Sequence, residues 1–254
     1  MPYINLKRYL KQRGVNKLNT ILFDLDGTLL SMDMILFEKI YFQELAKDFA
    51  DIMSPKELAQ NIWSSTKAMV QNIEYKTNEE VFMADFTTRM NMELPVLQKR
   101  FETFYDTSFL KIKDLVLDVK CIKESVNILK SKGYTVALAT NPLFPENAIH
   151  HRIRWAGFEP EDFSYISTFE KNHYCKPQLK YYEEILMDIE KNPSECLMVG
   201  NDVQEDLIAK KLGMKTYLIT NNLLHRTEEE IITDFTGEYE DFYEYVKGLP
   251  SLIS

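Results

Sequence analysis

Apolar and polar positions follow two different periods along the chain. Asn19–Phe23 is a short apolar run of β-prone residues, and it ends abruptly at Asp24 and Asp26, with Gly27 as a breaker. This pattern predicts a buried strand that delivers acidic side chains to its carboxyl end. From residue 34 to about residue 109 the apolar positions recur at helical spacing instead, which predicts a helical subdomain.

Start signals divide this helical segment into separate helices. Ser54-Pro55 and Leu94-Pro95 each place proline where a first helical turn tolerates it. Thr77 and Glu80 have the spacing of a capping box. The segment is therefore expected to contain several helices of ordinary length.

Strands and helices are predicted to alternate through the rest of the chain. Because repeating βα units form parallel sheets, we expect an α/β fold with a doubly wound, Rossmann-like core made of residues 1–33 and 110–254, interrupted by the helical segment 34–109. The predicted elements are helices at Ile122–Lys130 (stopped by Gly133), Ala148–Ala156, Leu179–Ile189, Asp206–Leu212 and Glu228–Tyr245, and strands at Tyr134–Ala139, Phe163–Ile166, Cys196–Val199 and Lys215–Ile219.

Composition and charge narrow the classes of function. The 254 residues carry a formal net charge of -9, which does not suit a nucleic-acid binder, so small molecules or metal complexes are the expected ligands. No run of about 18 uncharged apolar residues is present, and the three cysteines are widely spaced, so we expect a cytoplasmic protein without membrane or disulfide. The basic run between Lys7 and Lys17 is expected to be a solvated helix face. The sequence predicts no oligomeric state.

Polar side chains follow four of the apolar runs. They are Asp24 and Asp26, then Thr140 and Asn141, then Lys176 after a loop, and finally Asn201, Asp202 and Asp206. In parallel sheets ligands bind beyond the carboxyl ends of the strands, so these groups are expected to converge. Carboxylates that bind a hard cation, with a hydroxyl and a lysine, suit a phosphoryl group, and a second acid two residues after a nucleophilic Asp could protonate the leaving oxygen.

The four motifs that contain these residues resemble those of the haloacid dehalogenase superfamily of phosphohydrolases. The motifs are Asp24–Leu29, Leu138–Asn141, Lys176-Pro177 with Tyr181, and Val199–Asp206, in that order. The resemblance covers most of the chain and implies a Mg²⁺-dependent phosphatase for a small phosphorylated metabolite, working through an aspartyl-phosphate.

By this resemblance each motif residue has an expected role. Asp24 would be the nucleophile and Asp26 the general acid and then base, while Thr140, Asn141 and Lys176 would contact the phosphoryl group. Asp24, the Asp26 carbonyl and Asp202 would hold Mg²⁺, Asp206 would give acidic support, and Thr28 would orient the loop. Asn201 stands where Gly often precedes the metal-binding Asp. Asp202 is preferred to Asn201 as the ligand because a carboxylate binds Mg²⁺ better and because Asp206 lies four residues later.

Several alternatives remain open at this point. Lys171 and Lys180 are rivals of Lys176, and His150, His151, His173 and His225 are expected to be structural or at the surface. A phosphomutase would use the same Asp24 and Asp26. A dehalogenase would not need an acid at Asp26, and a phospho-receiver module would need neither that acid nor a lid.

The helical segment occupies the position at which the family carries an α-helical cap domain. We expect selectivity for the substrate to lie on its inner face, although most of its aromatic and Met residues should pack inside the helical bundle. The candidates are Phe37, Tyr41, Phe42, Trp63, Met69, Phe82, Phe86 and Tyr105.

Overall fold

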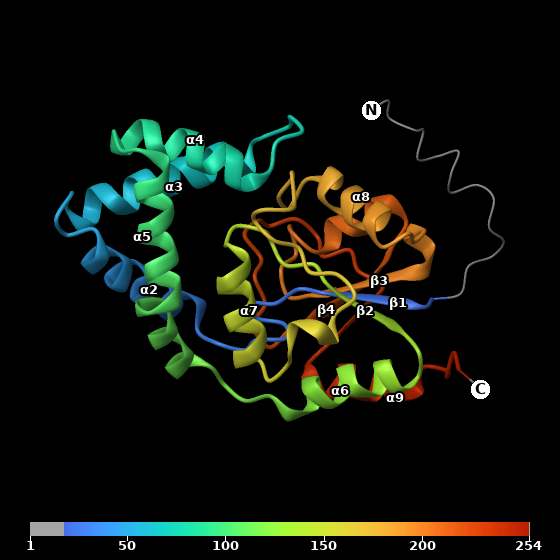
Figure 1. Ribbon diagram of the computed structural model, residues 1–254. Helices are drawn as coiled ribbons and strands as arrows, with labels where there is room; N and C mark the ends of the chain where they lie inside the picture. Colours follow the sequence, from blue (N-terminus) through green and yellow to red (C-terminus); the bar gives the residue numbers. More distant parts are fainter. Residues whose placement is uncertain (1–17, 254) are drawn as a thin grey trace.

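A parallel five-stranded sheet forms the centre of the computed structural model, which describes residues 18–253 (Figure 1). The strands are β1 (Thr20–Phe23), β2 (Thr135–Leu138), β3 (Cys196–Gly200), β4 (Lys215–Ile219) and β5 (Phe235–Gly237). Their spatial order is β2-β1-β3-β4-β5, so the first strand of the sequence lies inside the sheet. The chain leaves β1 toward β2 and returns to pair β3 on the other side of β1. The strand order therefore reverses next to β1, which is where open α/β sheets bind ligands.

Side chains of the inner strands alternate between two apolar layers. Ile21 and Phe23 of β1 join one buried cluster, whereas Leu22 between them joins the other. Strands β2 and β3 alternate in the same way, as the two-residue period of an extended chain requires. Both faces of the sheet are thus covered, which explains why these strands read as continuous apolar runs.

Helices pack on both faces of the sheet. The larger cluster contains buried residues of α6 (Lys120–Ser131), α7 (Glu146–Trp155) and α9 (Tyr239–Gly248), and the smaller one those of α8 (Leu179–Asp188). Figure 1 shows α6 and α9 side by side beneath the sheet and α8 above it. Short 3-10 helices lie at Ser108–Leu115, Pro160–Asp162, Pro193–Glu195 and Leu207–Leu212. The expected doubly wound α/β core is confirmed.

The first four helices that follow β1 in the chain lie to one side of the sheet (Figure 1). They are α2 (Met34–Asp48), α3 (Pro55–Val70), α4 (Asn78–Met90) and α5 (Leu94–Asp106). The predicted start signals are present: Ser54 caps α3 ahead of Pro55, and Thr77 and Glu80 form the capping box of α4. The aromatic pairs within this group, such as Phe82 with Phe86, explain the helical period of its apolar residues.

Three predictions of secondary structure were wrong. Residues 163–166 make only an isolated bridge from Ile166 to Leu138, at the open edge of β2. Residues 207–212 are helical as a 3-10 helix and not as an α-helix, and they follow a turn that is held by hydrogen bonds to Asp202. The predicted helix Glu228–Tyr245 begins only at Tyr239, since residues 235–237 extend β4 as an edge strand and Gly237 approaches Asp241 too closely for a side chain.

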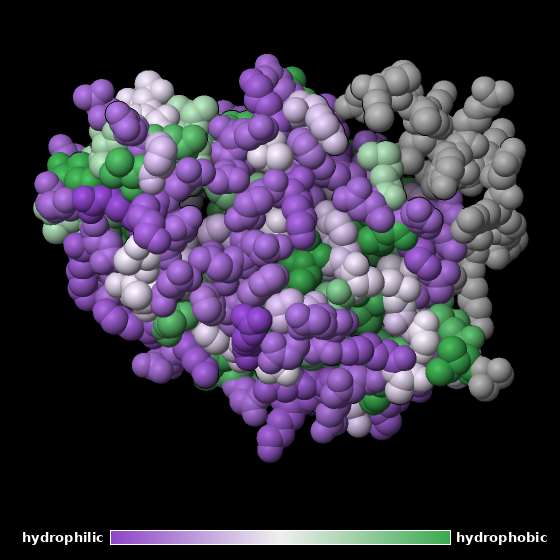
Figure 2. All heavy atoms as spheres, in the orientation of Figure 1, coloured by the Kyte–Doolittle hydropathy of each residue, from purple (hydrophilic) through white to green (hydrophobic). Residues whose placement is uncertain are grey.

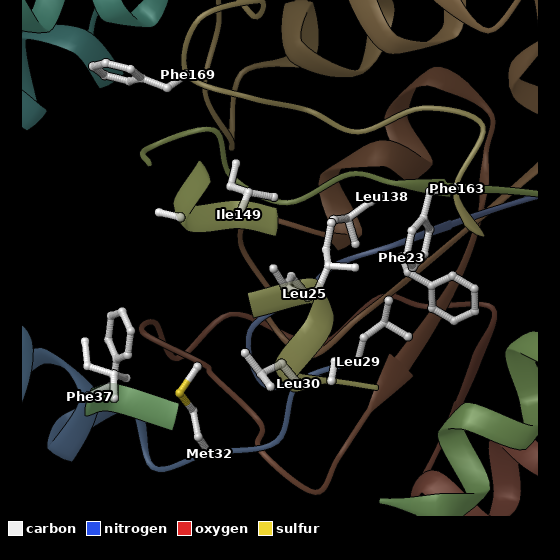
Figure 3. Close-up of a cluster of buried hydrophobic side chains, with 14 of the residues drawn as sticks. Phe23, Leu25, Leu29, Leu30, Met32, Phe37, Leu138, Ile149, Phe163 and Phe169 are labelled. Atoms are coloured by element: carbon white, nitrogen blue, oxygen red, sulfur yellow. The ribbon is translucent and has the colours of Figure 1, made fainter. Parts of the chain in front are cut away.

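The loop after β1 is packed into the larger apolar cluster. Figure 3 shows Leu25, Leu29 and Leu30 of this loop against Ile149 of α7 and Leu138 of β2. All five side chains are at most 2 % exposed, so the loop that carries the candidate acids is anchored in the core.

The surface is mostly hydrophilic, with apolar side chains in small scattered groups on the face drawn in Figure 2. Among the described residues no helix is long and apolar enough to cross a membrane. The basic run between Lys7 and Lys17 lies outside the described residues.

Candidate functional site

A pocket of about 860 Å³ opens between the carboxyl ends of the strands and helices α2–α5. Asp24 follows β1, Thr140 and Asn141 follow β2, and Asp202 follows β3. Side chains of all four line this pocket, together with Asp26 and Asp206. The strand ends therefore bring together the residues that the sequence predicted to converge.

Lys176 lies between two buried carboxylates at the base of the site. Its Nζ donates to Asp24 Oδ1 at 2.8 Å and to Asp206 Oδ1 at 2.6 Å, and its side chain is 1 % exposed. The rival lysines point elsewhere: Lys171 pairs with Glu146 and Lys180 donates to the Ile73 carbonyl. Lys176 is the lysine that reaches Asp24.

Burial dominates the electrostatics of this cluster. It raises the pKa of Asp24 to about 6 and that of Asp206 to about 7, although Lys176 opposes both shifts. Burial alone would lower the pKa of Lys176, but the carboxylates of Asp206 and Asp24 raise it well above its usual value. Two carboxylates around one ammonium leave an excess negative charge, which a bound cation would offset.

The turn after β3 is organised by carboxylate oxygens. Asp206 Oδ2 accepts the backbone N–H of Asp202 at 2.9 Å, and Asp202 Oδ1 accepts those of Gln204 and Glu205, both at 3.0 Å. Gly200 passes so close to Asp206 that an added Cβ would lie 2.0 Å from its Oδ2. Glycine is therefore required at this strand end for Asp206 to reach Lys176.

Asn201 ties the loop after β1 to the end of β3. Its Oδ1 accepts the Thr28 hydroxyl at 2.9 Å, and its Nδ2 donates to the Asn222 carbonyl at 2.7 Å. Gly27 has φ +82° and a Cβ there would lie 2.4 Å from Asn201 Nδ2, so this turn also needs glycine. Both ends of the Asn201 amide are used in these contacts, so Asn201 joins the two loops.

Thr140 and Asn141 are fixed by their neighbours. The Thr140 carbonyl accepts the hydroxyls of Tyr181 at 2.7 Å and Ser167 at 2.6 Å. Asn141 Oδ1 accepts the Lys176 N–H at 3.2 Å. The strand end after β2 is thereby joined to the loop that carries Lys176.

Asp26 forms an ion pair with Arg152 of α7, a residue that sequence reasoning missed. The Arg152 side chain is fully buried, with its guanidinium carbon 4.4 Å from the centre of the Phe144 ring. Asp26 Oδ1 and Arg152 Nη2 are buried and have no hydrogen-bond partner. The signal was present in the sequence, because Arg152 falls within the apolar stripe of its helix, between Ile149 and Ile153.

Two further charged residues were missed, Glu205 and Arg226. Arg226 Nη1 lies 2.5 Å from Asp202 Oδ2, and Nη2 lies 3.9 Å from Glu205. Glu205 also accepts from Asn141 Nδ2 at 3.0 Å, and burial raises its pKa to about 7. Both line the pocket. Arg226 lies in a loop beyond β4, so no local sequence pattern predicted its contact with Asp202.

The oxygen donors at this edge fit a hard divalent cation. Asp24 and Asp202 face one pocket, and burial with an excess of carboxylates provides the negative potential. No group of three or more His, Cys, Asp or Glu side chains in residues 18–253 is arranged to hold a metal. A pair of carboxylates such as Asp24 and Asp202 is compatible with Mg²⁺, because this ion retains several waters and takes few protein ligands.

The remaining candidates lie away from the pocket. None of the four histidines is among its described lining residues, and His173 pairs with Glu184. Burial raises the pKa of the Cys175 thiol, which makes it a poor nucleophile.

Comparisons with known proteins place this geometry in a family. The model of the haloacid dehalogenase-like hydrolases matches residues 21–219. A pyrophosphatase PpaX from Anoxybacillus flavithermus is 23% identical over 199 residues, which cover 78% of this chain and 82% of that protein.

Solved structures share the fold at low sequence identity. A HAD phosphatase from Thermococcus onnurineus has a TM-score of 0.58 and 17% identity, over 92% of this chain and 100% of that one. The putative HAD-hydrolase YfnB from Bacillus subtilis, described as bound to magnesium, has a TM-score of 0.55 and 17% identity, over 91% and 99%. Since the family model spans most of the sheet and all four motifs, the chain belongs to the haloacid dehalogenase-like hydrolases.

Proposed function

We propose that this hydrolase is a Mg²⁺-dependent phosphatase that removes the phosphoryl group from a small phosphate monoester through an aspartyl-phosphate on Asp24. The observation that carries the proposal is the buried Asp24 carboxylate, held at 2.8 Å by Lys176 in a pocket that Asp26, Thr140 and Asp202 also line. The pyrophosphatase and phosphatase named among its relatives support phosphate as the group transferred.

The first half-reaction uses two carboxyl groups. An oxygen of Asp24 attacks phosphorus, the bond from phosphorus to the ester oxygen breaks, and protonated Asp26 gives its proton to the departing alkoxide. The product is a free alcohol and a phosphorylated Asp24. Lys176, Thr140 and Asn141 contact the phosphoryl oxygens and keep the phosphorus aligned with Asp24.

The second half-reaction restores the enzyme. Water attacks the phosphorus of the aspartyl-phosphate, Asp26 takes a proton from that water, and inorganic phosphate leaves Asp24 as a carboxylate. Arg152 holds Asp26 by one carboxylate oxygen, which leaves the partnerless Oδ1 for these proton transfers.

Mg²⁺ held by Asp24, the Asp26 carbonyl and Asp202 would reduce the repulsion between the anionic nucleophile and the anionic phosphate. Asp206 supports this set by fixing the Asp202 backbone and Lys176. Thr28 supports it through Asn201.

We assign residues 34–109 to a cap domain over this site and residues 1–33 and 110–254 to the catalytic core. Helices α2–α5 supply much of the pocket wall opposite the strand ends, which supports a role in covering the substrate. Such a cover excludes water during the first transfer and admits it for the second.

A screen of phosphate monoesters with and without Mg²⁺, run on wild type and Asp24→Asn, tests the proposal. We expect turnover by wild type only with Mg²⁺, and loss of at least about 1,000-fold in Asp24→Asn, because the nucleophile is removed. Met187→Ala is a control, since this half-exposed residue of α8 lies outside the pocket. Equal activity of wild type and Asp24→Asn would show that the proposal is wrong.

A further inference from the structure

The wall of the pocket that faces the strand ends is aromatic. Seven aromatic side chains of α2–α5 line it: Phe37, Tyr41, Phe42, Trp63, Phe82, Phe101 and Tyr105. These rings also contact one another: Phe37 stacks on Tyr41, and Phe42 lies against Trp63 with ring centres 5.8 Å apart. Met69 and Phe86, by contrast, pack inside the helices and do not line the pocket. The part of a substrate beyond its phosphate would therefore contact aromatic side chains.

The same wall carries negative but no positive charge. Glu38, Glu79 and Glu102 of α2, α4 and α5 line it, whereas no Lys, Arg or His of these helices is among the described lining residues. Lys99, which pairs with Glu102, lies outside the pocket. A second anionic group on the substrate would face carboxylates and rings without a counter-ion, which is unfavourable in a partly desolvated pocket.

The core side adds to this charge pattern. Glu146 and Glu170 line the same pocket, and Glu170 accepts the Glu146 backbone N–H at 3.0 Å. Arg226 is the one cation among the described lining residues, and it already pairs with Asp202 at 2.5 Å. The positive charge of the site is thus confined to the strand ends, where a single phosphate would bind.

The volume of the pocket also favours a substrate larger than a diphosphate or a two-carbon ester. A volume of about 860 Å³ lies within the range of about 300–1,000 Å³ that encloses organic ligands of drug size. A diphosphate or a two-carbon ester would leave most of the aromatic wall uncovered.

We propose that the substrate is a phosphate monoester whose alcohol carries an aromatic or similarly bulky apolar group and no second anionic group. This inference rests on the proposed function and deepens it. Pyrophosphate, the substrate in the name of the PpaX relatives, is therefore not the preferred substrate of this chain.

Three alkyl phosphates with similar reacting bonds separate size from charge: ethyl phosphate, 2-phenylethyl phosphate and phosphoglycolate, with pyrophosphate beside them. We expect kcat/KM for 2-phenylethyl phosphate to exceed that for ethyl phosphate at least about 10-fold, because the ring is buried against aromatic side chains. Phosphoglycolate and pyrophosphate should fall below ethyl phosphate. A preference for either of these two would overturn the inference.

Two variants assign the selectivity to the wall. Trp63→Ala should reduce the ratio of kcat/KM between 2-phenylethyl and ethyl phosphate about 5-fold or more, because it removes a ring from the pocket. Thr66→Lys should raise the value for phosphoglycolate relative to ethyl phosphate, because it adds a cation to the lining. Tyr75→Ala is the matched control, since this aromatic residue is 75% exposed and outside the pocket. Unchanged ratios in both Trp63→Ala and Thr66→Lys would contradict the assignment.

Binding to Asp24→Asn distinguishes failure of this inference from failure of the proposed function. Calorimetry with Mg²⁺ present measures affinity for the same esters without requiring turnover. If wild type hydrolyses none of them, the proposed function is wrong, and the order of affinities still decides this inference. Equal affinity for 2-phenylethyl phosphate and phosphoglycolate would reject it.

Discussion

At the scale of single residues, the site joins groups that are costly to bury alone. Lys176 is 1 % exposed and contacts both Asp24 and Asp206, so each ion is tolerated because of the others. The two carboxylates exceed the one ammonium in charge. Such an arrangement favours catalysis over stability, because the unbalanced charge is available to a cation and a phosphate.

This imbalance predicts that Asp24→Asn stabilises the protein in the absence of divalent cations. Burial raises the pKa of Asp24 to about 6 in the folded protein. Between pH of about 4 and about 6 the unfolded chain has lost this proton while the folded protein still holds it. The free energy of unfolding therefore falls as the pH rises through this range. Asn has no such proton. Urea unfolding with EDTA should give the variant an advantage on the order of 2 kcal/mol at pH 7.5 that shrinks toward pH 4. An advantage independent of pH would contradict this explanation.

Asp26 and Arg152 predict a dependence on the leaving group. Asp26→Asn should lower kcat/KM for ethyl phosphate by about 100-fold or more, since an alkoxide needs a proton, but should affect kcat/KM for 4-nitrophenyl phosphate much less. Arg152→Met should show the same pattern more weakly, because it releases Asp26 from its ion pair. The ratio of the two kcat/KM values is the measurement, and it is independent of how much protein is folded. Equal losses of kcat/KM on both esters would exclude proton transfer from Asp26 to the leaving group.

Most of the motif residues could be predicted from sequence because they lie just after strands. Asp24, Thr140 and Asp202 lie within two residues of the ends of β1, β2 and β3, and parallel strands end at one edge of the sheet. Arg152 and Arg226 could not be predicted in the same way. Their partners are 126 residues away for Arg152 and 24 residues away, across another strand, for Arg226. Only the folded chain brings these charges together.

At the scale of elements, predictions succeeded where an apolar period was long and had a clear start or stop. The helix stopped at Gly133 and the helices begun at Pro55 and Pro95 are present. Residues 163–166 have the composition of a strand, but they form only one bridge beside β2. The propensity for extended backbone was correct there, since backbone hydrogen bonds still join Ser164 to Val136 and Leu138 to Tyr165.

The C-terminal segment failed for a related reason. The segment Glu228–Tyr245 was predicted to form one helix, whereas residues 235–237 pair with β4. The edge strand is stabilised by its neighbour, and the Thr236 hydroxyl also donates to the Leu218 carbonyl at 3.2 Å. Tertiary pairing of this kind leaves little periodic trace in a three-residue strand.

The turn between α3 and α4 is attached to the core by polar contacts. Gln178 Nε2 donates to the carbonyls of Val70 at 2.7 Å and Asn72 at 3.1 Å, and the Glu79 N–H donates to the Phe169 carbonyl at 3.0 Å. These contacts fix one end of the helical segment relative to the strand ends. The proposed cap would have to break or shift these contacts in order to open.

We therefore predict that Gln178→Ala loosens this attachment. Loss of two hydrogen bonds, at about 1 kcal/mol each, should increase amide hydrogen exchange in residues 70–79 and raise KM several-fold, while global unfolding changes little. Hydrogen exchange followed by mass spectrometry makes the measurement. Gln43→Ala, at an exposed position of α2, is the control. Increased exchange throughout the core would show that Gln178 stabilises the whole fold and not the attachment.

At the scale of the whole molecule, the sheet and helices α2–α5 contribute different kinds of side chain to the pocket. The sheet presents charged groups at the point where its strand order reverses, and the helices present an aromatic wall opposite them. Membership of the hydrolase family follows from the core, because the matching region includes all four motifs. The substrate does not follow from the core, since the wall that we propose contacts it is built from α2–α5. Reaction and selectivity can therefore change independently in this fold.

The central claim is that Asp24 itself carries the phosphoryl group. Wild type mixed with Mg²⁺ and a ³²P-labelled phosphate ester, then quenched in acid within one turnover, should contain label on the peptide that includes Asp24. We expect the label to be lost on treatment with hydroxylamine, which cleaves acyl phosphates, and to be absent from Asp24→Asn. Turnover of the ester with no label at Asp24, under conditions where Asp26→Asn also accumulates none, would contradict the account.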